Sequence, residues 1–228
     1  MTDPNQRADR YRLRLLFSKK PQIKYISHLD LSLTWERALR RAQIPLAYSQ
    51  GFNPRPKMQF ASGLPLGTSG TSEIVDIILT EPVQSEEVLA RIRAALPAGI
   101  GLHSAREVPL KSPTLQQLLR QAEYEVWVET DLSEVTLARR IADLLAADRI
   151  VQTRLRRRRA EDVDLRPWLH ELQLDAVGDG TAKLTMRLAA GQFGNLRPED
   201  VLKALGLAEN WAEIERKRLI FEEEIAPK

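Results

Sequence analysis

The chain has 228 residues, of which 43% are hydrophobic and 29% charged, and it contains no cysteine. This length fits one large domain or two small ones. The missing cysteines exclude a disulfide framework, a thiolate metal site, a cysteine-ligated iron–sulfur cluster and a thiol nucleophile within this chain. The 34 basic and 31 acidic residues give a formal net charge of +3, so the placement of the basic residues, rather than their number, has to indicate a partner.

No run in the sequence approaches the roughly 18–20 apolar residues that cross a bilayer, and the first ten residues lack the apolar core of a signal peptide. We therefore expect a cytoplasmic chain without membrane contacts. None of His28, His103 and His170 has a second ligand at metal-binding spacing, so we expect no metal site. A phosphate-binding loop, a dinucleotide motif and a nucleophile elbow are also missing, so we expect no bound cofactor.

The first half of the chain alternates between strand and helix patterns. Apolar and polar residues alternate over 11–19, which favours a half-buried strand. Ser27 precedes residues of helical period and is placed to cap a helix that ends before Pro45. The remaining elements are predicted at 46–49 and 57–60 (short strands around a loop), 73–80 (strand), 85–96 (helix) and 100–108 (strand). Their order, β-α-β-β-α-β, is that of a ferredoxin-like unit.

The second half repeats this alternation after a proline-containing linker. Its predicted elements are strands at 124–129, 150–158, 169–177, 181–188 and 212–222 and helices at 133–147 and 198–205. Gly178-Asp-Gly180 is a strong signal for a hairpin turn. We therefore expect an α+β fold of two tandem ferredoxin-like units with antiparallel sheets. The expected divisions are a flexible N-terminus (1–10), the first unit (11–108), a linker (109–122) and the second unit (123–224).

A cluster of arginines is the strongest indication of a partner. It consists of Arg154, Arg156, Arg157, Arg158 and Arg159, followed by Arg166. In a strand, alternate residues lie about 6.6 Å apart on one face, close to the spacing of phosphates in single-stranded RNA, and guanidinium groups bind phosphates through paired hydrogen bonds. The alternative is a solvated strand edge whose charges prevent pairing with another sheet.

The segment 48–57, with sequence YSQGFNPRPK, combines aromatic, amide and cationic side chains around a glycine. Aromatic rings beside cations can stack bases and bind phosphates of single-stranded RNA. The candidate RNA contacts here are Tyr48, Gln50, Asn53, Arg55 and Lys57, with Arg37 and Arg41 on the preceding helix. The alternative is a rigid loop in which the prolines fix the path and Phe52 fills the core.

His28 stands one residue inside the predicted helix. The positive end of the helix dipole favours neutral imidazole, which suits a general base. With Ser27, Tyr48 and Lys57 as possible neighbours, His28 could cleave RNA without a metal. The alternative is a structural histidine that bonds a backbone carbonyl or Asp30.

The chain resembles the radical SAM-associated (radical SAM-linked) proteins, a bacterial domain family of unassigned function. The resemblance rests on the segments 25–30 (YISHLD), 35–41 (WERALRR), 48–57 (YSQGFNPRPK) and 64–67 (LPLG), with a weaker continuation at 164–167 (DLRP). It implies a role in RNA metabolism or modification beside a radical SAM enzyme. Because this chain has no cysteine for the cluster of such an enzyme, the radical chemistry has to reside in a separate partner chain. A more distant likeness, at the level of the fold, is to repeat-associated RNA-processing endoribonucleases.

Three functional hypotheses follow. The first is a non-catalytic RNA-binding protein that presents RNA to a separate radical SAM enzyme. The second is a metal-independent endoribonuclease that uses His28. The third is a protein-docking adaptor in which Trp35, Trp168 or Trp211 anchors a partner.

Overall fold

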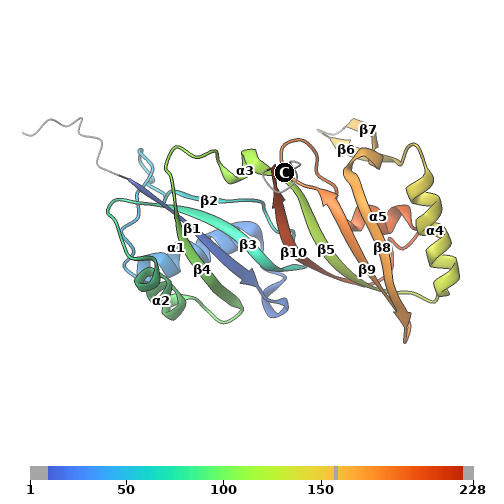
Figure 1. The fold of residues 1–228 in the computed structure, drawn as a ribbon, viewed down its shortest axis with the longest axis horizontal. Coiled ribbons are helices and arrows are strands. Elements are labelled where there is room, and N and C mark those ends of the chain that lie inside the picture. The colour runs from blue at the N-terminus through green and yellow to red at the C-terminus, as the bar shows by residue number, and fades with distance from the viewer. Residues whose placement is uncertain (1–9, 157–158, 223–228) are drawn as a thin grey trace, which may run out of the picture. The chain divides into compact units, whose positions relative to one another are not determined.

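The computed structural model describes residues 10–156 and 159–222, so almost all of the predicted flexible N-terminus lies outside the described residues. The chain divides into two compact units, Met1–Gln117 (unit 1) and Leu118–Lys228 (unit 2), and Figure 1 labels their elements. In the part of the chain that is described, no helix is long and apolar enough to cross a bilayer.

Unit 1 is built around an antiparallel sheet. Its elements are β1 (Tyr11–Lys19), η1 (Pro21–Ile23), α1 (His28–Arg41), β2 (Met58–Phe60), β3 (Thr68–Leu79), α2 (Ser85–Ala95) and β4 (Ile100–Val108), with the short α3 (Leu115–Leu118) at the boundary to unit 2. The strands lie side by side in the order β4-β1-β3-β2, and all three neighbouring pairs are antiparallel.

Alternation along the strands explains which face of this sheet carries the core. Leu13, Leu15 and Phe17 of β1 are buried with apolar residues of α1 and α2. Helix α1 begins as predicted, because Ser27 caps it by accepting a hydrogen bond from the backbone N–H of Asp30 at 3.1 Å. The intervening residues of β1 belong to the opposite face, which carries a polar cluster described below.

Two details of unit 1 differ from the prediction. The segment 46–49 forms only isolated bridges, because its partner at Tyr48 is Pro56, which has no N–H to continue a ladder. Strand β3 begins at Thr68 rather than at residue 73, so Gly70 lies inside the strand.

Unit 2 is also built around antiparallel sheet strands. Its elements are β5 (Leu119–Glu129), α4 (Glu134–Ala146), β6 (Val151–Arg156), β7 (Arg159–Asp164), η2 (Arg166–Trp168), β8 (Leu169–Gly178), β9 (Thr181–Ala189), α5 (Pro198–Ala204) and β10 (Ala212–Phe221). The sheet has the order β10-β5-β9-β8, with antiparallel neighbours. Helix α4 packs on β8 (Figure 1).

The predicted turn between β8 and β9 is confirmed, since Asp179 and Gly180 adopt φ values of 51° and 72°. Two other features were not predicted. Strand β5 begins at Leu119, so part of the expected linker belongs to the sheet. Strands β6 and β7 pair with each other to form a separate two-stranded ribbon, which we call the β6–β7 ribbon.

Candidate functional site

The β6–β7 ribbon carries the arginine cluster. Arg154 pairs with Asp200 at 2.6 Å, and its guanidinium carbon lies 5.9 Å from the centroid of the Trp168 ring. Arg157 and Arg158 lie outside the described residues, as do the side chains of Arg156 and Arg159. The alternation expected for these arginines therefore stays a prediction. Arg154 is the one arginine of the ribbon whose side-chain contacts the structure describes.

Arg166 has a structural environment within unit 2. Its guanidinium group donates to the carbonyl oxygen of Leu169 at 3.1 Å and to that of Leu145 at 2.9 Å. These bonds hold η2 against the end of α4. The guanidinium group of Arg166 therefore already stabilises the fold, and any contact with RNA has to use its remaining N–H groups.

Two adjoining pockets of unit 2, of about 450 and 470 Å³, share the lining residues Trp168, Phe193 and Gly194. Arg120 lines the first pocket and Arg154 the second. We call the set of Arg120, Arg154, Trp168 and Phe193 the arginine–aromatic cleft. Each of its two rings has a guanidinium group beside it.

The ring of Phe193 is 72% exposed, and the guanidinium carbon of Arg120 lies 4.3 Å from its centroid. Arg120 also pairs with Glu222 at 2.8 Å. A Cβ atom at Gly194 would come within 2.6 Å of the Trp168 ring, so only glycine lets the chain pass this close to the tryptophan. Local packing thus determines the position of the Trp168 ring.

His170 also lines the first pocket. Burial lowers the pKa of His170 below its ordinary value, the positive charge of Arg187 lowers it further, and Glu171 opposes the shift. The imidazole is therefore neutral near pH 7 and adds no charge to the arginine–aromatic cleft.

Sequence reasoning missed Arg120 and Phe193. The signal for Phe193 was an aromatic residue between two glycines in Gly191-Gln-Phe-Gly194, a pattern typical of a turn that exposes a ring. Arg120 gave no such signal, because it lies 73 positions from Phe193 and the fold alone brings the two together.

The loop at 48–57 is largely exposed, and Phe52 does not lie in the core where we expected it. Phe52 is 105% exposed, so the prediction that it fills the core is wrong. Two hydrophobic residues from elsewhere, Phe60 and Trp35, are buried beside Phe17 instead. Of the predicted RNA contacts here, Tyr48, Gln50, Asn53 and Arg55 are exposed and Lys57 is half-buried.

The basic residues near this loop differ in their surroundings. Arg37 is exposed on α1. Arg55 approaches Glu36 at 3.5 Å, and Arg41 donates to the carbonyl oxygen of Ala95 at 3.3 Å. The three guanidinium groups lie on the surface of unit 1 without lining either of the pockets in unit 2.

His28 and Lys57, which the sequence suggested as neighbours, line one pocket of about 670 Å³ in unit 1. Tyr48 and Ser27 are not among its lining residues. The His28 ring stands edge-on to Phe60, with 5.2 Å between ring centroids. The carboxylate of Asp30 accepts a hydrogen bond from the hydroxyl of Ser27 at 2.7 Å.

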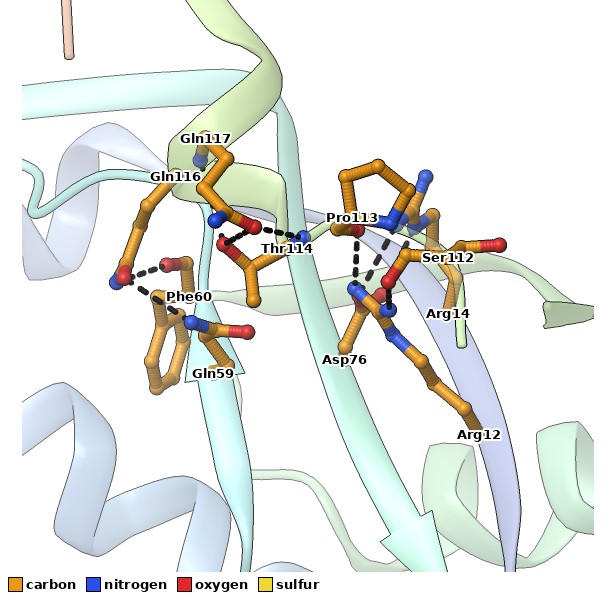
Figure 2. Close-up of polar contacts among 10 residues, drawn as sticks. All are labelled: Arg12, Arg14, Gln59, Phe60, Asp76, Ser112, Pro113, Thr114, Gln116 and Gln117. Carbon is orange, nitrogen blue, oxygen red and sulfur yellow. Dashed lines mark hydrogen bonds and ion pairs between the residues drawn. The ribbon is translucent and has the colours of Figure 1, made fainter. Parts of the chain in front are cut away.

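A polar cluster borders this unit 1 pocket. Figure 2 shows Arg12 and Arg14 converging on Asp76, whose side chain is 1% exposed. Arg12 also donates to the carbonyl oxygens of Ser112 and Pro113. Sequence reasoning did not assign these residues a site, although Asp76 interrupts an apolar run and so marked a charged position within a buried strand.

The three tryptophans suggested as docking anchors are not equivalent. Trp35 is 0% exposed and belongs to the core of unit 1, so its assignment as an anchor is wrong. Trp168 lines the arginine–aromatic cleft, and Trp211 is 51% exposed. Among the described residues, no group of three or more His, Asp or Glu side chains could hold a metal ion.

Comparison with known proteins gives a fold and a family. No curated protein matches the chain. Two solved structures resemble it at 13% identity: a Cbf5-Nop10-Gar1 complex (TM-score 0.52, covering 91% of this chain and 48% of that chain) and an H/ACA RNP bound to a substrate RNA containing 2'-deoxyuridine (TM-score 0.50, 91% and 47%).

The chain spans about half the length of these structures, and at such identity the likeness shows a mixed α/β fold with mostly antiparallel sheet. A protein-family model matches residues 12–198, which is more than half of the chain, and so shows the family to which the chain belongs. The chain therefore belongs to the bacterial family described as "Uncharacterized protein conserved in bacteria (DUF2344)".

Proposed function

We propose that the chain is a non-catalytic RNA-binding protein that holds single-stranded RNA in the arginine–aromatic cleft and presents it to a separate radical SAM RNA-modifying enzyme. The observation that carries the proposal is the pairing of each cleft ring with a guanidinium group: Arg120 with Phe193 and Arg154 with Trp168. Unpaired bases stack on aromatic rings while cations bind the phosphates between them.

The existing ion pairs of the two arginines do not oppose this function. Arg120 pairs with Glu222, which is 58% exposed, and Arg154 pairs with Asp200, which is 24% exposed. Ion pairs near the surface contribute about 0–1 kcal/mol to stability. A phosphate, which forms charge-assisted paired hydrogen bonds with guanidinium, can replace the exposed Glu222 at low cost and can compete with the less exposed Asp200 for Arg154.

The other predicted contacts extend the proposed RNA path. Arg156, Arg157, Arg158 and Arg159 follow Arg154 closely in the sequence, and the exposed loop at 48–57 offers a second surface in unit 1. An RNA partner is also supported by a structure of similar fold, the H/ACA RNP that is bound to a substrate RNA.

The radical SAM partner rests on the family resemblance and on the lack of cysteine. A radical SAM enzyme needs cysteines for its cluster, and this chain has none to offer. Co-purification of such an enzyme with the tagged chain from nuclease-treated cells supports the partnership. Recovery of the enzyme only when RNA is intact indicates that RNA bridges the two, and no recovery in either case contradicts it.

We also propose that the two units are tandem ferredoxin-like domains, the first over 11–108 and the second beginning with β5 at Leu119, inside the linker expected at 109–122. The order of strands supports this. Numbered within each unit and leaving out the β6–β7 ribbon, the strands follow the order 4-1-3-2 in both units. The same ββ and βαβ connections thus recur in two halves without obvious sequence identity.

The test of RNA binding is fluorescence anisotropy with a labelled single-stranded RNA over a salt series. We expect Arg154→Ala to weaken binding and to reduce the slope of log K against log salt by about 0.7 per lost phosphate contact. Arg139→Ala is the matched control, because Arg139 is an exposed arginine of unit 2 outside the cleft. No binding at low salt, or equal slopes for both variants, contradicts the proposal.

A metal-independent endoribonuclease is the second candidate, because His28 and Lys57 line the same unit 1 pocket. A neutral imidazole could accept the proton of a 2′-hydroxyl while the ammonium stabilises the charged phosphate. Cleavage of RNA in EDTA that is lost in His28→Ala while RNA binding survives supports this function. Equal cleavage by the variant excludes His28 as the base.

A further inference from the structure

The unit 1 pocket has positive charge that no carboxylate of its polar cluster neutralises. Asp76 accepts from Nε and Nη2 of Arg12 at 2.8 and 2.5 Å and from Nε and Nη2 of Arg14 at 2.8 and 3.0 Å (Figure 2). Oδ2 accepts three of these bonds and Oδ1 accepts one, so both carboxylate oxygens are engaged. The cluster of two guanidinium groups and one carboxylate has a net charge of +1, and its Arg12 and Asp76 line the pocket.

Lys57 adds a second positive charge. It is half-buried, lines the pocket, and has a fixed backbone: its N–H donates to Ala47 and its carbonyl oxygen accepts from Ile78, at 2.8 and 3.0 Å. Across residues 10–156 and 159–222, no carboxylate pairs with its ammonium group. A half-buried ammonium beside a further positive charge favours an anionic ligand.

A pair of amide side chains contributes to another part of the lining. Gln59 Nε2 donates to Gln116 Oε1 at 3.0 Å, and Gln116 Nε2 donates to the Phe60 carbonyl oxygen at 3.1 Å (Figure 2). Each amide nitrogen has a second N–H, and the two amides are thus oriented donors at the pocket. Apolar lining completes the wall, from Met58, Phe60, Ile78 and Leu110.

We propose that the unit 1 pocket binds a nucleoside monophosphate, with the phosphate at Lys57 and the base between the apolar wall and the Gln59–Gln116 pair. The volume of about 670 Å³ lies within the range of small-molecule sites. Apolar lining with a few oriented polar groups is typical of such sites. The nucleotide is either free or the 5′ end of an RNA, and the proposal does not depend on RNA binding by unit 2.

Calorimetric titration of the intact chain with AMP, GMP, CMP, UMP and inorganic phosphate tests the site. We expect at least one monophosphate to bind, and Lys57→Gln to weaken it and phosphate by about tenfold or more, because a charge-assisted hydrogen bond is lost. Gln59→Leu should weaken the monophosphate and leave inorganic phosphate unaffected. Lys20→Gln, which changes an exposed lysine of the same unit that does not line the pocket, is the control and should bind as the wild type does.

Three results overturn the proposal: no binding of any monophosphate, unchanged binding in Lys57→Gln, or equal weakening in Lys20→Gln. Melting curves establish that each variant is folded. Displacement of a fluorescent monophosphate distinguishes the sources. Competition by a short 5′-phosphorylated RNA, but not by its unphosphorylated form, assigns the site to an RNA end, and competition by free monophosphate alone assigns it to a free nucleotide.

Discussion

The guanidinium carbon of Arg120 lies 4.3 Å from the centroid of the Phe193 ring. A cation at this distance interacts favourably with the ring and holds it in a defined orientation, although 72% of the ring is exposed. An exposed aromatic side chain that is held in place loses little conformational entropy when a base stacks on it. In the proposed function, the Arg120–Phe193 contact would therefore prepare the arginine–aromatic cleft for an unpaired base.

Replacing Phe193 removes this stacking surface. Base–aromatic stacking contributes about 1–3 kcal/mol per base, so Phe193→Ala should weaken single-stranded RNA binding by about fivefold or more. Equilibrium anisotropy measures the change. Val135→Ala is the control, because Val135 is also an exposed hydrophobic residue of unit 2 but lines neither pocket. Equal affinity of the two variants would contradict a stacking role.

Gly194→Ala tests the position of the Trp168 ring. The new Cβ would meet the ring at 2.6 Å, so the ring has to move, whereas the Cβ of Gly178→Ala has no neighbour within 4 Å. We expect Gly194→Ala to shift the tryptophan fluorescence and to weaken RNA binding, while Gly178→Ala changes neither. If RNA binding of Gly194→Ala stays at the wild-type level despite a shifted spectrum, the Trp168 ring is not part of the RNA site.

Asp76→Asn should destabilise unit 1 strongly. The substitution leaves the guanidinium groups of Arg12 and Arg14 without their shared carboxylate, and breaking a buried ion pair costs about 3–5 kcal/mol. The free energy of unfolding in urea measures the loss. Asp143→Asn, in an exposed pair with Arg139, should cost less than about 1 kcal/mol. Similar losses in both variants would show that the cluster does not stabilise the fold.

His170 should make stability depend on pH. Burial and Arg187 lower its pKa in the folded state, so the unfolded chain takes up the proton first as pH falls. Stability is therefore lost as pH falls through the ordinary histidine pKa of about 6.5, and the loss stops growing below the folded value. His170→Gln should remove this part of the pH dependence in denaturation curves. Curves of the same shape for wild type and variant would exclude the effect.

Periodicity predicted most of the elements. Helices α1, α2 and α4 have apolar residues at helical spacing, and the β8–β9 hairpin has a glycine-flanked aspartate at its turn. Strand β6 lies within the strand predicted at 150–158, but β7 and its pairing with β6 escaped prediction, because Arg159–Asp164 is rich in charged residues and shows no apolar alternation. The start of β5 was missed because polar residues follow Leu119 directly after a short helix.

The candidate site depended more on the fold than on any motif. Phe52 and Phe193 both follow or precede glycine, and sequence alone could not show which phenylalanine stands beside an arginine. Asp76 gave a signal as a charge within an apolar run, but its partner Arg12 lies 64 positions away. Contacts of this range are decided by strand register, which the sequence pattern leaves open for a polar residue.

Ultraviolet crosslinking of bound single-stranded RNA, followed by mass spectrometry of the crosslinked peptides, tests the RNA site most directly. The account predicts crosslinks in the peptides that contain Trp168 or Phe193, reduced in Arg120→Ala. Crosslinks confined to the loop at 48–57, with its exposed Tyr48 and Phe52, would contradict the assignment of the RNA site to the arginine–aromatic cleft.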